Sequence, residues 1–223
     1  MSKHLYVHEI FPSISGEAGG GFPQGSYCQF VRFSGCNLRC SWCDTAGTQT
    51  FHDCKSLSIK TIVNSLETHP VKNVIITGGE PLLQRIGLDS LIKCLLELNY
   101  IVQVETNGTL PLLNIPEKVY WVVDYKTYSS NMTYMMPDLD ELKADFEGKR
   151  VDVKFVVSDM FDLRQSIDVM KVLNELPIKF IISPLNADTS MINQILSYIK
   201  VDNYNLLSKI VISIQLHKLL NMP

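Results

Sequence analysis

The sequence predicts an α/β protein whose parallel sheet curves into a partial, open barrel of about six to seven strands. Three observations predict it: short apolar, β-branched runs recur, segments with helical spacing separate them, and polar motifs follow several runs. Continuous apolar runs such as 74–76 and 180–182 are typical of strands covered on both faces. Alternating strands and helices imply right-handed crossovers and a parallel sheet.

The expected elements alternate from residue 28 to the C-terminus. Strands are expected at residues 28–33, 74–77, 101–105, 120–125, 153–157, 179–182 and 210–215. Helices are expected at residues 58–68, 88–98, 139–147, 161–175 and 189–201, and the second of these carries one apolar stripe formed by Leu88, Leu91, Ile92 and Leu95.

Length favours the open form of the barrel. A closed eight-unit barrel takes roughly 250 residues, about 31 per unit. Residues 28–223 number 196 (223 − 27), enough for about six such units. No linker divides the chain, so residues 1–223 are expected to form a single domain. Five of the twelve glycines lie in residues 16–25, a mobile loop that is either a connector or a lid over the site.

Composition excludes several functional classes. The 223 residues carry 20 Lys+Arg and 23 Asp+Glu, a net charge of −3, which does not suggest a nucleic-acid surface or a polybasic membrane anchor. The 46% hydrophobic and 19% charged content is that of a globular protein. No apolar run reaches the roughly 18 residues of a membrane span, and the N-terminus has no apolar signal core. We therefore expect a soluble cytoplasmic protein that binds neither nucleic acid nor membrane.

Three of the six cysteines, Cys36, Cys40 and Cys43, lie within eight residues. Thiolates at this spacing fit three corners of a cubane iron–sulfur cluster, with one iron left open to an external ligand. A zinc site with Cys54 or His52 as fourth ligand and a ferredoxin-like electron carrier are the alternatives. The other three cysteines, Cys28, Cys54 and Cys94, are expected to be buried small hydrophobes.

Notable motifs follow the predicted strands. Catalytic groups of barrels and open α/β sheets collect at the C-terminal ends of the strands, so these motifs are expected to line one site. They occupy residues 35–43, 77–81, 105–108, 124–126, 183–186 and 215–217.

Two of these motifs together resemble the radical S-adenosylmethionine (SAM) superfamily. Cys-x3-Cys-x2-Cys with Trp42 before the last cysteine is similar to its cluster motif, and residues 77–81, Thr-Gly-Gly-Glu-Pro, are similar to its glycine motif. The resemblance implies a 4Fe-4S cluster and SAM as cofactors.

The flanking segments narrow the resemblance to the 7-carboxy-7-deazaguanine synthase family. They are residues 9–17, 30–38, 43–45, 104–108 and 215–218. The resemblance implies conversion of 6-carboxy-5,6,7,8-tetrahydropterin to 7-carboxy-7-deazaguanine with release of ammonia, on the route to queuosine and other deazapurines. It also implies Mg²⁺ as a third cofactor, an external electron donor such as a flavodoxin, and a homodimer.

The same resemblance implies the site residues. Cofactor contacts are expected at Trp42, Cys43, Asp44, Gly78, Gly79, Glu80, Glu105, Asp124, Lys126, Ser183 and Asn186. Substrate contacts are expected at Ile14, Ser15, Gly16, Glu17, Arg32, Thr77, His217 and Pro223, with the tail 215–223 closing on the site. The expected metal ligands are Cys36, Cys40 and Cys43 for the cluster and Thr45 for Mg²⁺.

The chemistry of three of these side chains suits the expected roles. Arg32 can bind the pterin carboxylate in a bidentate pair, Glu17 can accept from a guanine-like edge, and Thr45 offers a hard oxygen. Ordinary structural roles remain open, namely a strand-end ion pair for Arg32, an exposed loop acid for Glu17, a turn or cap for Thr45, a satisfied buried acid for Glu105 and a frayed terminus for Pro223.

Three departures from the family pattern bear on the exact substrate. Ser15 replaces a usual Gln, the loop is lengthened by Ala18 and the glycines to Gly25, and Asp124-Tyr125 precedes Lys126 where many members have Ser-Pro. Two alternatives to the synthase stay open: a radical SAM activase of a partner enzyme, and a non-catalytic iron–sulfur or zinc protein.

Overall fold

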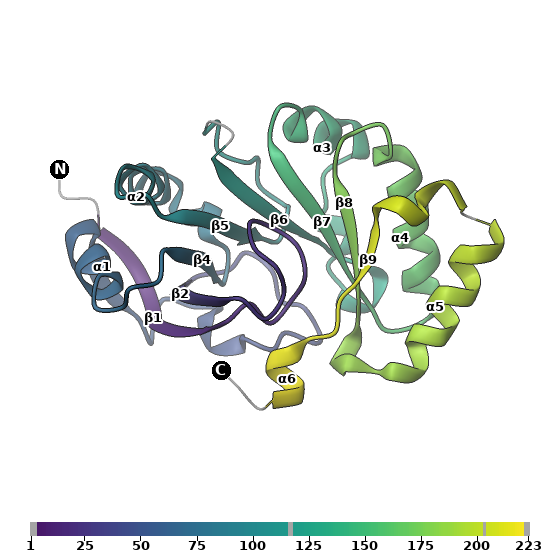
Figure 1. Cartoon of the computed structure of the whole chain (residues 1–223), viewed down its shortest axis with the longest axis horizontal. Helices are drawn as coiled ribbons and strands as arrows, with labels where there is room; N and C mark the ends of the chain where they lie inside the picture. The colour runs from purple at the N-terminus through teal and green to yellow at the C-terminus, as the bar shows by residue number, and fades with distance from the viewer. Residues whose placement is uncertain (1–3, 116–117, 203, 221–223) are drawn as a thin grey trace.

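The structure is a computed structural model that describes residues 4–115, 118–202 and 204–220, without the side chains of residues 189, 200–202, 204, 217 and 218. A nine-stranded sheet in the order β3-β1-β2-β4-β5-β6-β7-β8-β9 forms its centre (Figure 1). The strands are β1 (His4–Ile14), β2 (Tyr27–Phe33), β3 (Lys55–Ser58), β4 (Asn73–Gly78), β5 (Ile101–Thr106), β6 (Val119–Tyr125), β7 (Arg150–Val157), β8 (Lys179–Pro184) and β9 (Ile210–Ile212).

In the chain, helices alternate with the parallel strands, and in space they cover the outer face of the sheet (Figure 1). They are α1 (Ile59–Leu66), α2 (Arg85–Glu97), α3 (Leu139–Phe146), α4 (Met160–Leu173) and α5 (Thr189–Asp202), followed by the short C-terminal α6 (Leu216–Leu220). No helix within the described ranges is long and apolar enough to cross a membrane.

The predicted fold class is confirmed. Each of the seven expected strands is present, as β2 and β4 to β9, and these strands pair in parallel. The sheet remains open, because β3 and β9 at its two edges do not pair. The five expected helices are present with ends shifted by up to three residues.

The sequence patterns missed the antiparallel edge formed by β1 and β3 and the short helix α6. β1 carries Pro12 and several polar residues, which is typical of edge strands and weakens the periodic signal. β3 has only four residues, none of them fully buried. Pairing with β2 and β1 therefore decided these two strands, rather than their local sequence.

Side-chain caps begin two of the helices where the sequence changes from strand to helix. The Ser58 hydroxyl accepts from the Thr61 amide at the start of α1. Asp159 accepts from the amides of Phe161 and Asp162 at the start of α4. The helices then pack apolar side chains on one face of the sheet, where residues such as Trp121 and Phe155 are fully buried. This core fixes the strand ends that carry the site.

The glycine-rich segment 16–25 crosses the opposite face of the sheet. A Cβ at Gly19, Gly20 or Gly21 would lie 2.1, 1.9 or 2.6 Å from side-chain atoms of Ile181, Gln103 and Tyr120, on β8, β5 and β6. Both Gly19 and Gly20 also have positive φ angles. The three glycines thus let the backbone lie directly against the sheet. The segment therefore lies against β5, β6 and β8 and carries Glu17 to the cavity wall.

The three cysteines outside the cluster motif differ in burial. Cys28 is fully buried, and burial raises the pKa of its thiol to about 12. Cys54 and Cys94 are only half-buried, and the Cys54 thiol donates to the Phe51 carbonyl. The expectation of a buried small hydrophobe is therefore confirmed for Cys28 alone.

Candidate active site

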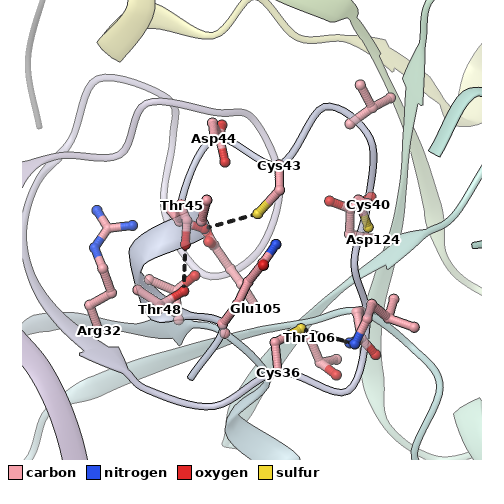
Figure 2. Close-up of a pocket in the computed structure, with 18 of the residues that line it drawn as sticks. Arg32, Cys36, Cys40, Cys43, Asp44, Thr45, Thr48, Glu105, Thr106 and Asp124 are labelled. Atoms are coloured by element: carbon pink, nitrogen blue, oxygen red, sulfur yellow. Dashed lines mark hydrogen bonds between the residues drawn. The ribbon is translucent and has the colours of Figure 1, made fainter. Parts of the chain in front are cut away.

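A cavity of about 790 Å³ lies at the C-terminal ends of the strands, on the face away from the helices. Its walls come from the segment after β2, the ends of β4 to β7 and the glycine-rich loop (Figure 2). It brings together most of the residues expected from the sequence: Ile14, Gly16, Glu17, Arg32, Cys36, Cys40, Trp42, Cys43, Asp44, Thr45, Thr77, Gly78, Gly79, Glu105, Asp124 and Lys126.

The loop carrying the three cysteines is closed at its base by backbone hydrogen bonds. The Gly35 amide donates to the Thr48 carbonyl at 2.7 Å, and the Cys36 amide donates to the Gln49 carbonyl at 3.2 Å. At its far side the Trp42 indole N–H donates to the Ser129 hydroxyl at 3.0 Å. The loop is thereby fixed with all three thiols on the cavity wall (Figure 2).

The three thiols line one cavity and can each bind a different iron of a cubane cluster. Within the described ranges, no three Cys, His, Asp or Glu side chains are placed to hold one metal ion. A tetrahedral zinc site draws its ligands onto one centre, whereas the thiolates of a cubane cluster bind different irons. Burial raises the pKa of Cys36 and Cys40, and the nearby Lys126 ammonium lowers it. Lys126 thus favours the thiolate that a cluster needs.

Gly78 and Gly79 bring the end of β4 against the cysteine loop. A Cβ on Gly78 would lie 2.1 Å from the Phe33 carbonyl oxygen, and one on Gly79 would lie 2.1 Å from the Gly35 carbonyl oxygen. Gly78 also has a φ of 126°. Only glycine fits this contact between two backbones. The Gly79 amide donates to Phe33 and the Glu80 amide to Gly35, which ties the two motifs together.

Glu80 does not line the cavity, contrary to the expected cofactor contact. Its carboxylate is fully buried and accepts from the Leu82 amide at 2.9 Å, the Thr106 hydroxyl at 2.8 Å and the Asn107 amide at 2.7 Å. Burial raises the pKa of Glu80, while these hydrogen bonds oppose that rise. The acid of the glycine motif therefore joins the ends of β4 and β5, because its oxygens are occupied by the protein.

A group of partly buried charges forms the floor of the cavity. Lys154 Nζ lies 2.5 Å from Glu17 Oε2 and 3.3 Å from Asp124 Oδ2, and Lys126 Nζ lies 3.1 Å from the same Asp124 atom. Although burial opposes it, these ammonium groups hold the pKa of Asp124 below its usual value. Glu105 differs: burial, followed by repulsion from Glu17, raises its pKa.

Sequence reasoning did not single out Lys154. It lies within β7, in the middle of an apolar run, where the expected strand gave it no functional reading. The available signal was strand alternation: Asp152 and Lys154 both point away from the helix-covered face, and Asp152 accepts from the Gly20 amide. Other cavity residues that were not expected from the sequence include His8, Glu9 and Gln49, whereas Asn107 belongs to the expected motif 105–108.

Arg32 lines the cavity and also makes the ion pair left open as its ordinary role. Its Nε lies 2.8 Å from Glu9 Oε1, and its guanidinium carbon lies 5.2 Å from the centroid of the Phe11 ring. The Arg32 side chain is 14% exposed. Glu9 and Phe11 thus hold the guanidinium from one edge and one face, a placement that suits recognition of a planar carboxylate.

Thr45 lies directly after the cysteine loop and lines the cavity. Its carbonyl accepts from the Thr48 amide at 2.8 Å, while its hydroxyl makes no cap of the short helix that follows. The hydroxyl oxygen is 3.9 Å from Cys43 Sγ (Figure 2). Because the cap is not made, the hydroxyl suits a Mg²⁺ ligand, and the Asp44 carboxylate at the cavity wall adds a second hard oxygen.

Besides Glu80, three expected residues with described side chains, Ser15, Ser183 and Asn186, do not line the cavity. Ser15 is buried, and its hydroxyl donates to the carbonyl of Glu17 within its own loop. Ser183 is buried at the end of β8, and Asn186 is exposed with a φ of 54°, although Leu185 between them reaches the cavity. His217 lies in α6 with its side chain outside the described part, and Pro223 lies outside the described residues.

One orphaned polar atom of the cavity, Asp124 Oδ1, fits SAM as a ligand. Asp124 Oδ1 and Ser183 Oγ are buried without a hydrogen-bond partner among the described residues. They stand at the ends of β6 and β8, beside the cysteine loop and Leu185. Buried polar groups are nearly always paired, so Asp124 Oδ1, which belongs to a residue of the cavity wall, suits a polar ligand bound above the strand ends.

Comparisons with known proteins agree with this site. The model of the Radical SAM superfamily matches residues 30–185. A 7-carboxy-7-deazaguanine synthase of Clostridium acetobutylicum is 35% identical over 97% of this chain and 96% of its own, and one of Methanospirillum hungatei is 33% identical over 100% and 88%. The crystal structure of QueE from Escherichia coli shares the fold, with a TM-score of 0.72 at 20% identity over 95% of this chain and 94% of its own.

The family implies a 4Fe-4S cluster and SAM as cofactors, and the residues of the cavity fit both. A matching family model over most of the chain and relatives that match it from end to end agree with the geometry. This chain therefore belongs to the 7-carboxy-7-deazaguanine synthase family of radical SAM enzymes.

Proposed function

We propose that this protein converts 6-carboxy-5,6,7,8-tetrahydropterin to 7-carboxy-7-deazaguanine with release of ammonia, in deazapurine biosynthesis of the queuosine type. One observation carries the proposal: a single cavity combines the three cysteine thiols with a guanidinium, Arg32, and a carboxylate, Glu17. The substrate has the matching groups, an anionic carboxylate and a pyrimidine edge with N–H donors. The relatives named for this reaction support it.

When bound, the cluster and SAM supply the radical that begins the ring contraction. The protein has to hold the substrate and exclude other reactions. We assign the substrate carboxylate to Arg32, whose guanidinium is preoriented by Glu9 and Phe11. Glu17, ion-paired with Lys154, accepts from the pyrimidine edge, and the backbone of Ile14 and Gly16 lies beside it.

We assign binding of the cluster, Mg²⁺ and SAM to the other residues of the cavity. Cys36, Cys40 and Cys43 ligate the cluster, and Thr45 ligates Mg²⁺. Asp124, Glu105 and the Gly78–Gly79 backbone bind polar groups of SAM, and Lys126 stabilises Asp124. The Lys126 ammonium lies 5.1 Å from the centroid of the Trp42 ring, so it also holds the cysteine loop.

The chain is expected to act as a single domain, as a homodimer in the cytoplasm, with electrons from an external donor such as a flavodoxin. An activase of a partner enzyme is the weaker alternative, since the cavity offers a guanidinium and carboxylate suited to a small charged substrate. A non-catalytic iron–sulfur or zinc protein would give no role to Arg32 and Glu17 inside the cavity.

Anaerobic turnover tests the proposal. The cluster is reconstituted, then reductant, SAM, Mg²⁺ and carboxytetrahydropterin are added, and the products are followed by mass spectrometry. Formation of 7-carboxy-7-deazaguanine is the expected result. Deoxyadenosine without the deazaguanine would retain the radical chemistry and reject this substrate. Replacement of Arg32 by Met should abolish pterin turnover while sparing uncoupled SAM cleavage, and equal loss of both would contradict its carboxylate role.

A further inference from the structure

Gln215 stands between the C-terminal tail and the cavity, at the residue before α6. It is 4% exposed and lines the cavity. Its Nε2 donates to Glu17 Oε1 at 2.7 Å, whereas its Oε1 is buried without a hydrogen-bond partner in the part of the chain that the structure describes. One end of this amide is therefore used by the protein and the other is not.

The orientation of the Gln215 amide is fixed by charge. Glu17 is ion-paired with Lys154, and the carboxylate of an ion pair only accepts hydrogen bonds. The amide must therefore turn its NH₂ group toward Glu17, because the flipped amide would oppose two oxygens. Lys154, through Glu17, directs the carbonyl of Gln215 away from the acid.

The backbone around Gln215 is tied to the glycine-rich loop. The Leu216 amide donates to the Gly16 carbonyl at 2.9 Å, and the Ala18 amide donates to the Ser213 hydroxyl at 2.9 Å. Gln24 Nε2 bridges the carbonyls of Gly16 and Ile214 at 2.9 and 2.5 Å. Glu17 holds the amide group of Gln215, and the glycine-rich loop holds the backbone on both sides of it. The side-chain carbonyl of Gln215 is therefore a preoriented acceptor at the cavity wall.

We propose that Gln215 is a substrate-recognition residue whose side-chain carbonyl accepts a hydrogen bond from the amino group on the pyrimidine edge of the substrate. The proposal rests on the proposed function above. A buried acceptor without a partner is unfavourable, and an N–H donor of the ligand removes that penalty. Ser15 cannot do this, because its hydroxyl donates within its own loop and it does not line the cavity. Glu17 and Gln215 together read the edge that carries the donors.

Equilibrium binding to the cluster-loaded enzyme, with SAM and without reductant, tests the proposal. Two ligands are compared: carboxytetrahydropterin and its 2-oxo counterpart, in which a carbonyl oxygen replaces the amino group. In the parent enzyme the 2-oxo compound places one acceptor against another and should bind more weakly. The measured quantity is the dissociation constant of the 2-oxo compound divided by that of carboxytetrahydropterin. Gln215→Leu should reduce this ratio about tenfold, the usual effect of one buried hydrogen bond. An unchanged ratio would overturn the proposal.

Gln24→Leu is the matched control, since it makes the same chemical change at the same junction of loop and tail, and Gln24 does not line the cavity. It should lower the thermal midpoint and keep the ligand ratio. An equal fall of the ratio in Gln24→Leu would show that any loosening of the junction between loop and tail has this effect, and it would overturn the proposal. If Gln215→Leu folds poorly, Gln215→Asn takes its place. It withdraws the side-chain carbonyl by one methylene and should lower the ratio of the two dissociation constants in the same way.

Failure of the two proposals can be told apart. Absence of pterin binding and of deazaguanine product in the parent enzyme would reject the proposed function, and the role of Gln215 would fall with it. Normal turnover by the parent enzyme with an unchanged ratio in both Gln215 variants would reject the role of Gln215 alone.

Discussion

Lys154 and Glu17 meet across the cavity floor at 2.5 Å, although 136 residues separate them in the chain (154 − 17 − 1). Lys154 lies in β7, and Glu17 is carried there by the glycine-rich loop that crosses the sheet. The same ammonium lies 3.3 Å from Asp124 at the end of β6. This one side chain therefore links the end of the cavity assigned to the substrate with the end assigned to SAM.

Replacement of Lys154 by Met should destabilise the protein by about 2–4 kcal/mol, since it leaves Glu17 without its countercharge in a largely buried position. The ammonium also holds down the pKa of Asp124, so SAM binding should weaken together with pterin binding. Urea denaturation and calorimetric titration of both ligands measure these effects. Lys143→Met is the control, because Lys143 pairs with Glu175 on the exposed surface, where an ion pair contributes little to stability.

Glu105→Gln should make the protein more stable, with a gain that grows as the pH rises. The folded-state pKa of Glu105 is raised, so the folded protein holds this proton more tightly than the unfolded chain. Stability from this group is present below the unfolded pKa and is lost as the pH rises toward the folded pKa. Gln keeps the oxygen that accepts from Gln103 Nε2 and carries no charge.

Thermal midpoints of parent and Glu105→Gln at pH 5 and pH 8 measure this difference, and the SAM affinity of the variant should be reduced. If the stability gained by Glu105→Gln became smaller from pH 5 to pH 8, the pKa of Glu105 would not be raised in the folded protein. Glu141→Gln is the control, because it makes the same replacement of a carboxylate by an amide on α3, outside the cavity.

Gly79→Ala should prevent correct closure of the cysteine loop. The new Cβ would lie 2.1 Å from the Gly35 carbonyl oxygen and 2.8 Å from that of Thr48, and backbone atoms on both sides leave little room to move. Iron bound per protein after reconstitution should fall strongly. Gly148→Ala is the control: its φ is +70° but its Cβ meets nothing within 4 Å, so it should cost about 1 kcal/mol and retain the cluster.

Glu80→Gln should lower stability by about 2 kcal/mol, because a fully buried carboxylate that accepts from three donors is replaced by an amide with one acceptor oxygen. Urea denaturation of the cluster-loaded protein measures the loss. SAM affinity of the folded variant should change little. Unchanged stability with lost SAM affinity would instead restore the cofactor contact expected from the sequence.

Thr45→Val should raise the Mg²⁺ concentration needed for half-maximal turnover by tenfold or more, since it removes a hard oxygen ligand at nearly constant shape. Thr45→Ser keeps the hydroxyl and should behave like the parent enzyme. Activity titrations with Mg²⁺ after chelation distinguish the two. The Thr45 carbonyl, which accepts from the Thr48 amide, is present in every variant, so the loop itself should persist. Equal Mg²⁺ dependence of Val and Ser variants would exclude the hydroxyl as ligand.

Much of the fold was predictable from local patterns. Parallel strands such as β4 and β8 contain continuous apolar runs, a local signal that survives in the tertiary structure. β1 and β3 were not predictable, because a polar edge strand forms only once its partner strand is in place. The elements missed are thus those whose stability comes from pairing rather than from periodicity.

The candidate site divides in the same way. The cysteine motif, the glycine pair, Arg32 and Glu17 were identified from sequence and resemblance, and the cavity brings them together. Lys154 was not, since a lysine within an apolar strand carries no motif of its own. The tail motif 215–217 was expected at the site, but it did not show that the side-chain carbonyl of Gln215 has no partner among the described residues. For Glu80, spacing did not reveal that the protein already supplies three donors to its carboxylate.

The sequence by itself determined the alternation of strands and helices, the spacing of the three thiols and the two glycines at the end of β4. These are short-range properties, fixed by side-chain pattern and backbone sterics. Only the tertiary structure decided that the glycine-rich loop lies across the sheet, that Glu80 is buried, and that Lys154 joins Glu17 to Asp124. Those outcomes depend on which buried charges and amides meet, and residues far apart in the chain meet only after the sheet has formed.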